Sequence, residues 1–164
     1  MDSIARKYKT WIEIDRSAIK HNYDAFRALL GPKTRLMAVV KSNAYGHDIV
    51  QFSKEAEKLG ADFFAVDEAR EAFLLQDSGI KKPILVLNYI EEDLLKEVVE
   101  RGVSFIVSNF NMLDRTIALK DLGPKIHIDV DTGLGRLGFA EKDMEKLLSI
   151  LLAEKLSVEG LYKH

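Results

Sequence analysis

The sequence predicts an α/β fold, and within that class a (β/α)8 barrel of the TIM type that stops after about its sixth strand. Short apolar runs alternate with amphipathic stretches, as in a parallel sheet, where neighbouring strands need long crossovers. In residues 126–131 (IHIDVD), His127, Asp129 and Asp131 share one face and apolar side chains share the other. A doubly wound sheet buries both faces of its central strands, whereas a barrel carries polar residues inside its mouth. This pattern favours the barrel.

Seven runs alternate or are rich in β-branched and aromatic residues, which is typical of strands. Six of them are predicted to form the sheet, at residues 36–40, 63–66, 84–87, 105–107, 126–130 and 158–161. The seventh, residues 11–15 (WIEID), alternates in the same way and is also interpreted as a strand. Because a complete barrel occupies ~250 residues, residues 1–164 are expected to form a partial barrel domain.

Amphipathic helices are predicted between these strands. Ser17 is expected to cap the first helix, which should stop before Gly31. Apolar residues recur at helical spacing in three later stretches, which cover residues 49–59, 94–99 and 144–152. Gly60 and Gly102 can adopt the left-handed conformation that ends the first two of them.

The composition excludes several classes of function. The formal net charge is -2 and the pI is about 6.1, without the basic excess that nucleic-acid binding needs. The sequence has no cysteine, so neither disulfides nor thiolate metal sites can form, and no metal site is expected. No run approaches the ~20 apolar residues of a membrane span. We therefore expect a cytoplasmic protein that binds neither nucleic acid nor membranes.

Lys41 is the first candidate for chemistry. It directly follows the apolar run 36–40 and opens the polar loop SNAYGHD, and barrels carry their functional residues on loops that follow strands. A lysine in a cleft suits Schiff-base chemistry. Position alone favours the alternative, a strand-end lysine that extends into solvent.

Arg136 is the second candidate, within the glycine-rich run DTGLGRLG at residues 131–138. The glycines permit tight turns, and a guanidinium can bind a carboxylate through two parallel hydrogen bonds. The alternative is a surface arginine that pairs with Asp131.

These two motifs, VKSNAYGHD at residues 40–48 and DTGLGRLG at residues 131–138, resemble the N-terminal barrel domain of the alanine racemase family of fold type III pyridoxal-phosphate enzymes. The resemblance extends over residues 9–164. It implies that Lys41 forms the internal aldimine with pyridoxal 5'-phosphate and that Tyr45 hydrogen-bonds the cofactor phosphate. It also implies that Arg136 contacts the substrate carboxylate and the phenolic oxygen of the cofactor.

The resemblance assigns supporting roles as well. Asn43 is expected to shape the lysine loop, and His164 in LYKH, where the family usually has LYTH, to pack against the pyridine ring. Asp129 stands where many family members have a carbamylated lysine that orients the arginine. Asp129 keeps the negative charge on a shorter stem, so whether it reaches the arginine directly or through a water or an ion stays open. Asp131 and His127 are expected to give polar support.

The function that the resemblance implies is the interconversion of L-alanine and D-alanine, which supplies D-alanine for peptidoglycan. The second base would be a tyrosine from the C-terminal β domain of the other subunit in a homodimer. That β domain is absent from residues 1–164, so we expect this chain alone to exchange the Cα proton of alanine slowly or not at all. A broad-specificity or serine racemase stays open, as does a non-catalytic pyridoxal-phosphate carrier or assembly module.

Overall fold

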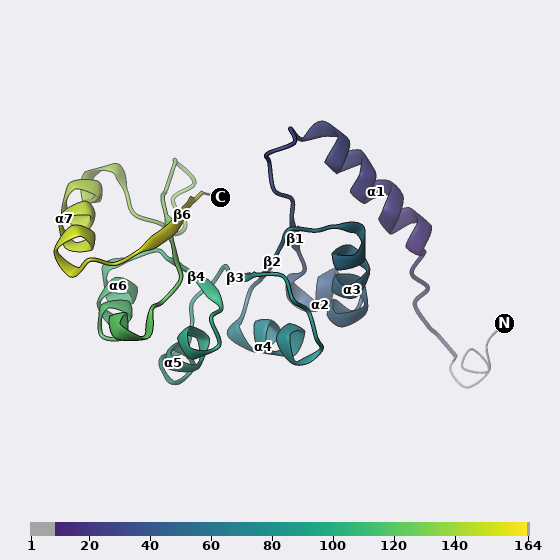
Figure 1. The fold of residues 1–164 in the computed structure, drawn as a ribbon, viewed down its shortest axis with the longest axis horizontal. Helices are drawn as coiled ribbons and strands as arrows, with labels where there is room; N and C mark the ends of the chain where they lie inside the picture. The colour runs from purple at the N-terminus through teal and green to yellow at the C-terminus, as the bar shows by residue number, and fades with distance from the viewer. Residues whose placement is uncertain (1–8, 164) are drawn as a thin grey trace.

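The computed structural model describes residues 9–163, in which strands and helices alternate along the chain (Figure 1). The strands are β1 (Met37–Val39), β2 (Phe63–Val66), β3 (Ile84–Val86), β4 (Ser104–Val107), β5 (Ile126–Asp129) and β6 (Val158–Tyr162). The helices are α1 (Arg16–Leu29), α2 (Lys41–Tyr45), α3 (Ile49–Leu59), α4 (Ala69–Asp77), α5 (Glu92–Glu100), α6 (Phe110–Ile117) and α7 (Met144–Glu154). Two short 3-10 helices are η1 (Lys120–Leu122) and η2 (Glu141–Asp143).

The strands form one parallel sheet in which each strand pairs with the next in sequence, in the order β1-β2-β3-β4-β5-β6. The sheet curves into an arc with α3 to α7 on its outer side, and the arc is open between β1 and β6 (Figure 1). Sequential parallel strands joined by outer helices are the arrangement of a (β/α) barrel. The predicted fold class and the six sheet strands are therefore confirmed.

The two faces of the sheet bury different sets of apolar side chains. In β2, Phe64 belongs to the large core between the strands and the helices, whereas Phe63 belongs to a smaller inner cluster with Leu85 and Ile106. Burying a side chain of this size contributes about 1.5–3 kcal/mol. The alternation along each strand thus stabilises the helix layer and fills the inside of the arc.

Strand β5 carries the polar inner face that favoured a barrel. Its outward side chains, Ile126 and Ile128, are buried in the helix-side core. On the inner face, His127 lies 3.7 Å from the Glu159 carboxylate. A Cβ at Gly160 would lie only 2.9 Å from Nδ1 of this histidine, so β6 needs a glycine there.

The segment before α1 differs from its prediction in two ways. Residues 11–15 form no strand, and Trp11 instead donates a hydrogen bond to Glu13 while its side chain stays 55% exposed. Alternation makes a strand only where a neighbour supplies hydrogen-bond partners, and among residues 9–163 no strand pairs with this segment. The cap of α1 is Asp15, whose carboxylate accepts from the Ser17 backbone N–H at 2.7 Å; the prediction of Ser17 as the cap was wrong.

Candidate active site

A cavity of about 420 Å3 lies at the carboxyl ends of the strands, the end where barrels place their functional residues. Its lining comes from the ends of β1, β2, β3, β5 and β6, from within β4, and from the glycine-rich loop after β5. The lining residues are Lys41, Asp67, Leu87, Asn88, Ile106, Asp129, Arg136, Leu137 and Tyr162. The structure therefore brings the two principal candidates, Lys41 and Arg136, into one cavity although they lie far apart in sequence.

The turn that carries Lys41 has an unusual backbone. The four residues after the lysine, residues 42–45, have φ values of 52° to 55°, in the left-handed region, although none of them is glycine. Gly46 continues with φ +90°. Each left-handed residue costs about 1–2 kcal/mol, and such strain persists only where the surroundings hold it and is concentrated at functional sites.

Two side chains hold this turn. The Asn43 side-chain oxygen accepts a hydrogen bond from the Ile49 backbone N–H at 2.9 Å, at the start of α3. Glu71 on α4 accepts from the Asn43 N–H at 3.1 Å with one oxygen and from the Asp67 N–H at 3.1 Å with the other. The Glu71 carboxylate thus ties the lysine turn to the end of β2.

The Lys41 amine has an anionic partner inside the cavity. Lys41 Nζ lies 3.2 Å from Oδ1 of Asp67, and the Asn88 amide donates to Oδ2 of the same carboxylate at 3.2 Å. The sequence-based predictions included neither Asp67 nor Asn88. Each lies one or two residues beyond a buried strand, so the rule that functional residues follow barrel strands could have found them.

The glycine-rich loop folds around Asp131. The Asp131 carboxylate accepts hydrogen bonds from the backbone N–H groups of Gly133 and Gly135 at 2.9 and 3.0 Å. These bonds, with that from Gly135 first, hold the pKa of Asp131 below its usual value. Within residues 9–163 no ion pair joins Asp131 to Arg136 or to His127, so Asp131 organises its own loop and leaves the guanidinium at the cavity.

Asp129 and Tyr162 line the same cavity as Arg136. Asp129 is 3% exposed and ends β5. Burial raises the pKa of the Tyr162 phenol, and the nearby Asp129 charge raises it further, while Arg136 and Lys41 oppose the shift. The Tyr162 side chain therefore stays protonated near neutral pH and can act as a hydrogen-bond donor.

The remaining predicted site residues lie apart from this cavity. Tyr45 is 62% exposed and is not among the residues that line it, and Asn43 lies in the turn behind Lys41. His164 lies outside the residues that the structure describes.

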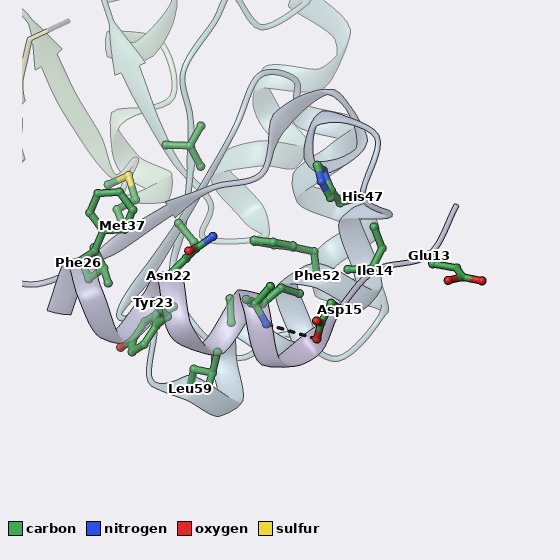
Figure 2. Close-up of a pocket in the computed structure, with 17 residues that line it drawn as sticks. Glu13, Ile14, Asp15, Asn22, Tyr23, Phe26, Met37, His47, Phe52 and Leu59 are labelled. Carbon is green, nitrogen blue, oxygen red and sulfur yellow. Dashed lines mark hydrogen bonds between the residues drawn. The ribbon is translucent and has the colours of Figure 1, made fainter. Parts of the chain in front are cut away.

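A second cavity, of about 480 Å3, lies between α1, β1 and α3 (Figure 2). Its wall is mostly apolar, with Phe26 of α1 and Phe52 of α3 pointing into it. The Asp15 carboxylate there caps α1, and Nδ1 of His47 is within hydrogen-bond distance of the Ala44 carbonyl. The cavity at the strand ends, where an amine, a guanidinium and two carboxylates meet, is therefore the stronger candidate for chemistry.

Comparison with known proteins identifies the family. Residues 14–164 match the family model described as alanine racemase, N-terminal domain. The chain belongs to the alanine racemase family. The fold expected for the N-terminal domain of an alanine racemase and the recognition of the two motifs are thereby confirmed.

Individual alanine racemases resemble the chain over nearly all of its length. The alanine racemase of Methanococcus maripaludis is 44% identical over 160 residues, which is 94% of this chain and 43% of the relative. A crystal structure of alanine racemase from Bacillus anthracis, solved with bound L-Ala-P, superposes with a TM-score of 0.86 at 37% identity and covers 94% of this chain and 41% of that one. The alanine racemase of Streptomyces lavendulae superposes with a TM-score of 0.85 at 33% identity, over 92% of this chain and 41% of that one. The chain thus spans less than half the length of these alanine racemases.

Two kinds of feature are absent from the described part of the chain. No helix in residues 9–163 is long and apolar enough to cross a membrane. In the same residues no group of three or more histidine, cysteine, aspartate or glutamate side chains could hold a metal ion.

Proposed function

We propose that this chain forms the cofactor-binding part of a pyridoxal-phosphate-dependent enzyme that interconverts L-alanine and D-alanine. One observation carries the proposal: in a chain of the alanine racemase family, the Lys41 amine and the Arg136 guanidinium line the same cavity. The longer relatives are named alanine racemase, and the alanine racemase of Bacillus anthracis was solved with bound L-Ala-P. The chain covers 43% and 44% of the first two relatives, so the activity of a whole racemase is part of this proposal.

The cavity residues fit the proposed cofactor and substrate. A volume of about 420 Å3 lies within the range of roughly 300–1,000 Å3 found for small-molecule sites. A primary amine is the group that condenses with an aldehyde, and Lys41 presents one at the cavity wall. When bound, pyridoxal phosphate supplies a conjugated ring that delocalises negative charge from the substrate carbon. Tyr45 is proposed to bind its phosphate, with Asn43 holding the turn.

The residues of this chain then have distinct roles. Arg136 holds the substrate carboxylate through paired hydrogen bonds, while Asp129 supplies negative charge beside it and Asp131 keeps the loop in shape. The Lys41 amine would accept the proton from the substrate carbon on one side. The Tyr162 phenol, whose pKa burial raises, stays protonated and can donate a hydrogen bond at the cavity wall.

Further features of the parent protein follow from the same proposal. The second base would come from a C-terminal β domain in a homodimer, and the histidine at position 164 would pack against the cofactor ring. The protein would act in the cytoplasm and supply D-alanine to the cell wall. Turnover of alanine, serine and lysine by the longer protein, measured side by side, would decide between a selective and a broad-specificity racemase.

The assignment of Lys41 can be tested by chemical labelling. The chain is incubated with pyridoxal phosphate and reduced with borohydride, and the labelled peptide is identified by mass spectrometry. We expect the label on Lys41, and Lys41→Ala should remove it, whereas Lys54→Ala, which changes an exposed lysine on α3, should leave it in place. A label that persists in Lys41→Ala, or that lies mainly on another lysine, would refute the assignment.

A further inference from the structure

We propose that Asp67 is a positioning residue that holds the Lys41 amine in the cavity, and that Asn88 and Glu71 fix the aspartate for this task. The inference rests on the proposed function, because it concerns the same lysine. It adds an anionic partner of Lys41 to the two motifs that the sequence analysis identified.

Three bonds define the place of Asp67. Its Oδ1 pairs with Lys41 Nζ at 3.2 Å, and its Oδ2 accepts from the Asn88 amide at 3.2 Å. Its backbone N–H donates to Glu71 at 3.1 Å. Both carboxylate oxygens and the backbone are therefore engaged, so the aspartate has little freedom to follow a lysine that moves.

The Lys41 amine needs a partner to stay in one position, because the side chain that carries it is flexible. A lysine ammonium is a compact charge at the end of a flexible four-carbon stem, and ordering that stem costs up to about 2 kcal/mol of conformational entropy. The Lys41 side chain is 36% exposed, so it has access to solvent. On the cavity wall beside Asp67, Leu87 offers no side-chain acceptor.

The order of the strands makes Asp67 the neighbouring carboxylate. Lys41 follows β1 and Asp67 follows β2, and β1 and β2 pair directly. Asp129, the other carboxylate in the cavity, ends β5, three strands beyond β2 in the sheet. The two carboxylates therefore have different neighbours. Asp67 pairs with the Lys41 amine, and Asp129 lies near the Tyr162 phenol and the Arg136 guanidinium.

The test measures how accessible the Lys41 amine is in the chain without added cofactor. Acetylation by a water-soluble N-hydroxysuccinimide ester is followed residue by residue with mass spectrometry. Asp67→Asn should raise the acetylation rate of Lys41 about two- to fivefold, the factor expected when a partly exposed ion pair is lost. Asn88→Ala should act in the same direction by a smaller factor, and Asp67→Glu should restore part of the protection.

Glu68→Gln is the matched control, because it removes the same charge from the adjacent, exposed position and should leave the Lys41 rate unchanged. Circular dichroism and thermal unfolding establish that each variant folds. If Asp67→Asn does not fold, Asn88→Ala carries the test. Acetylation of Lys41 at the wild-type rate in a folded Asp67→Asn or Asn88→Ala chain would overturn the inference.

The two proposals fail in different experiments. If borohydride fixes no pyridoxal phosphate on Lys41 of the unmodified chain, the proposed function fails whatever the acetylation rates are. If Lys41 takes the label but its acetylation rate is the same in Asp67→Asn as in the wild type, the proposed function stands and the positioning role is wrong.

Discussion

Gly138 shows how closely the glycine-rich loop folds back on strand β5. Its φ is +106°, and a Cβ there would lie 2.7 Å from the Asp131 backbone nitrogen and 3.0 Å from the Val130 carbonyl carbon. Both neighbours are backbone atoms, which cannot turn aside as a side chain can. A side chain at position 138 would therefore push the loop that carries Arg136 away from the cavity.

We predict that Gly138→Ala destabilises the chain more than Gly135→Ala does. Gly135 has φ +69°, and a Cβ there would meet no atom within 4 Å, so alanine at this position costs only the left-handed penalty of about 1–2 kcal/mol. The steric contacts at position 138 should add about 1–3 kcal/mol to the loss of unfolding free energy. Urea unfolding measures both losses, and equal values for the two variants would contradict the prediction.

At the level of single residues, sequence and structure agree where the signal is local. Lys41 and Arg136 belong to short motifs that contain their own turn residues, so both could be predicted to lie at a site. Asp67 and Asn88 carry no such signal, because their importance comes from partners on other strands. Asp131 was expected to give polar support, and the structure shows its carboxylate accepting from backbone N–H groups of its own loop.

At the level of elements, α2 is the least predictable part of the chain. Left-handed backbone is usually signalled by glycine or asparagine, and in residues 42–45 only Asn43 gives a hint. The turn is held by its surroundings: Glu71 accepts from the Asn43 N–H, the Asn43 side chain accepts from Ile49, and Ala44 is buried. By contrast, α3 and α7 were predicted from apolar periodicity that their own sequences contain.

The second prediction concerns the bond that ties α4 to this turn. Glu71→Gln replaces one of two accepting oxygens with an amide that donates, so one of the two backbone N–H groups loses its acceptor. The loss should cost about 1–3 kcal/mol locally and appear as faster amide hydrogen exchange at Asn43 or Asp67, measured by NMR. Glu68→Gln on the same helix start should leave both amides protected; unchanged protection in Glu71→Gln as well would show that the turn holds itself.

At the scale of the whole molecule, the polarity of residues 126–131 correctly predicted a barrel because a barrel has an inside. A polar group joins β4, β5 and β6. In it, Ser104 of β4 donates to Glu159 of β6 at 2.7 Å, and His127 of β5 lies near the same carboxylate. The partners in this group lie up to 55 residues apart, so sequence analysis could indicate the polar face but not its pairs.

The third prediction is a dependence of global stability on pH. Burial lowers the pKa of His127 below its ordinary 6.5, with Arg35 acting in the same direction and Glu159 against it. Between the folded-state pKa and about 6.5 the unfolded chain binds more protons, so the free energy of unfolding should fall as pH drops through this window. Urea unfolding at several pH values should show a shallower fall in His127→Gln, whereas His21→Gln, at an exposed position on α1, should keep the wild-type profile.

Pairing of each strand with its successor has a consequence for biosynthesis. Lys41, Asp67 and Asn88 follow the first three strands, so all three side chains belong to the first 88 residues of the chain. A nascent chain can bring the amine and its carboxylate together while the arginine is still inside the ribosome. Translation would then assemble the two halves of the pocket in a fixed order, the lysine half first.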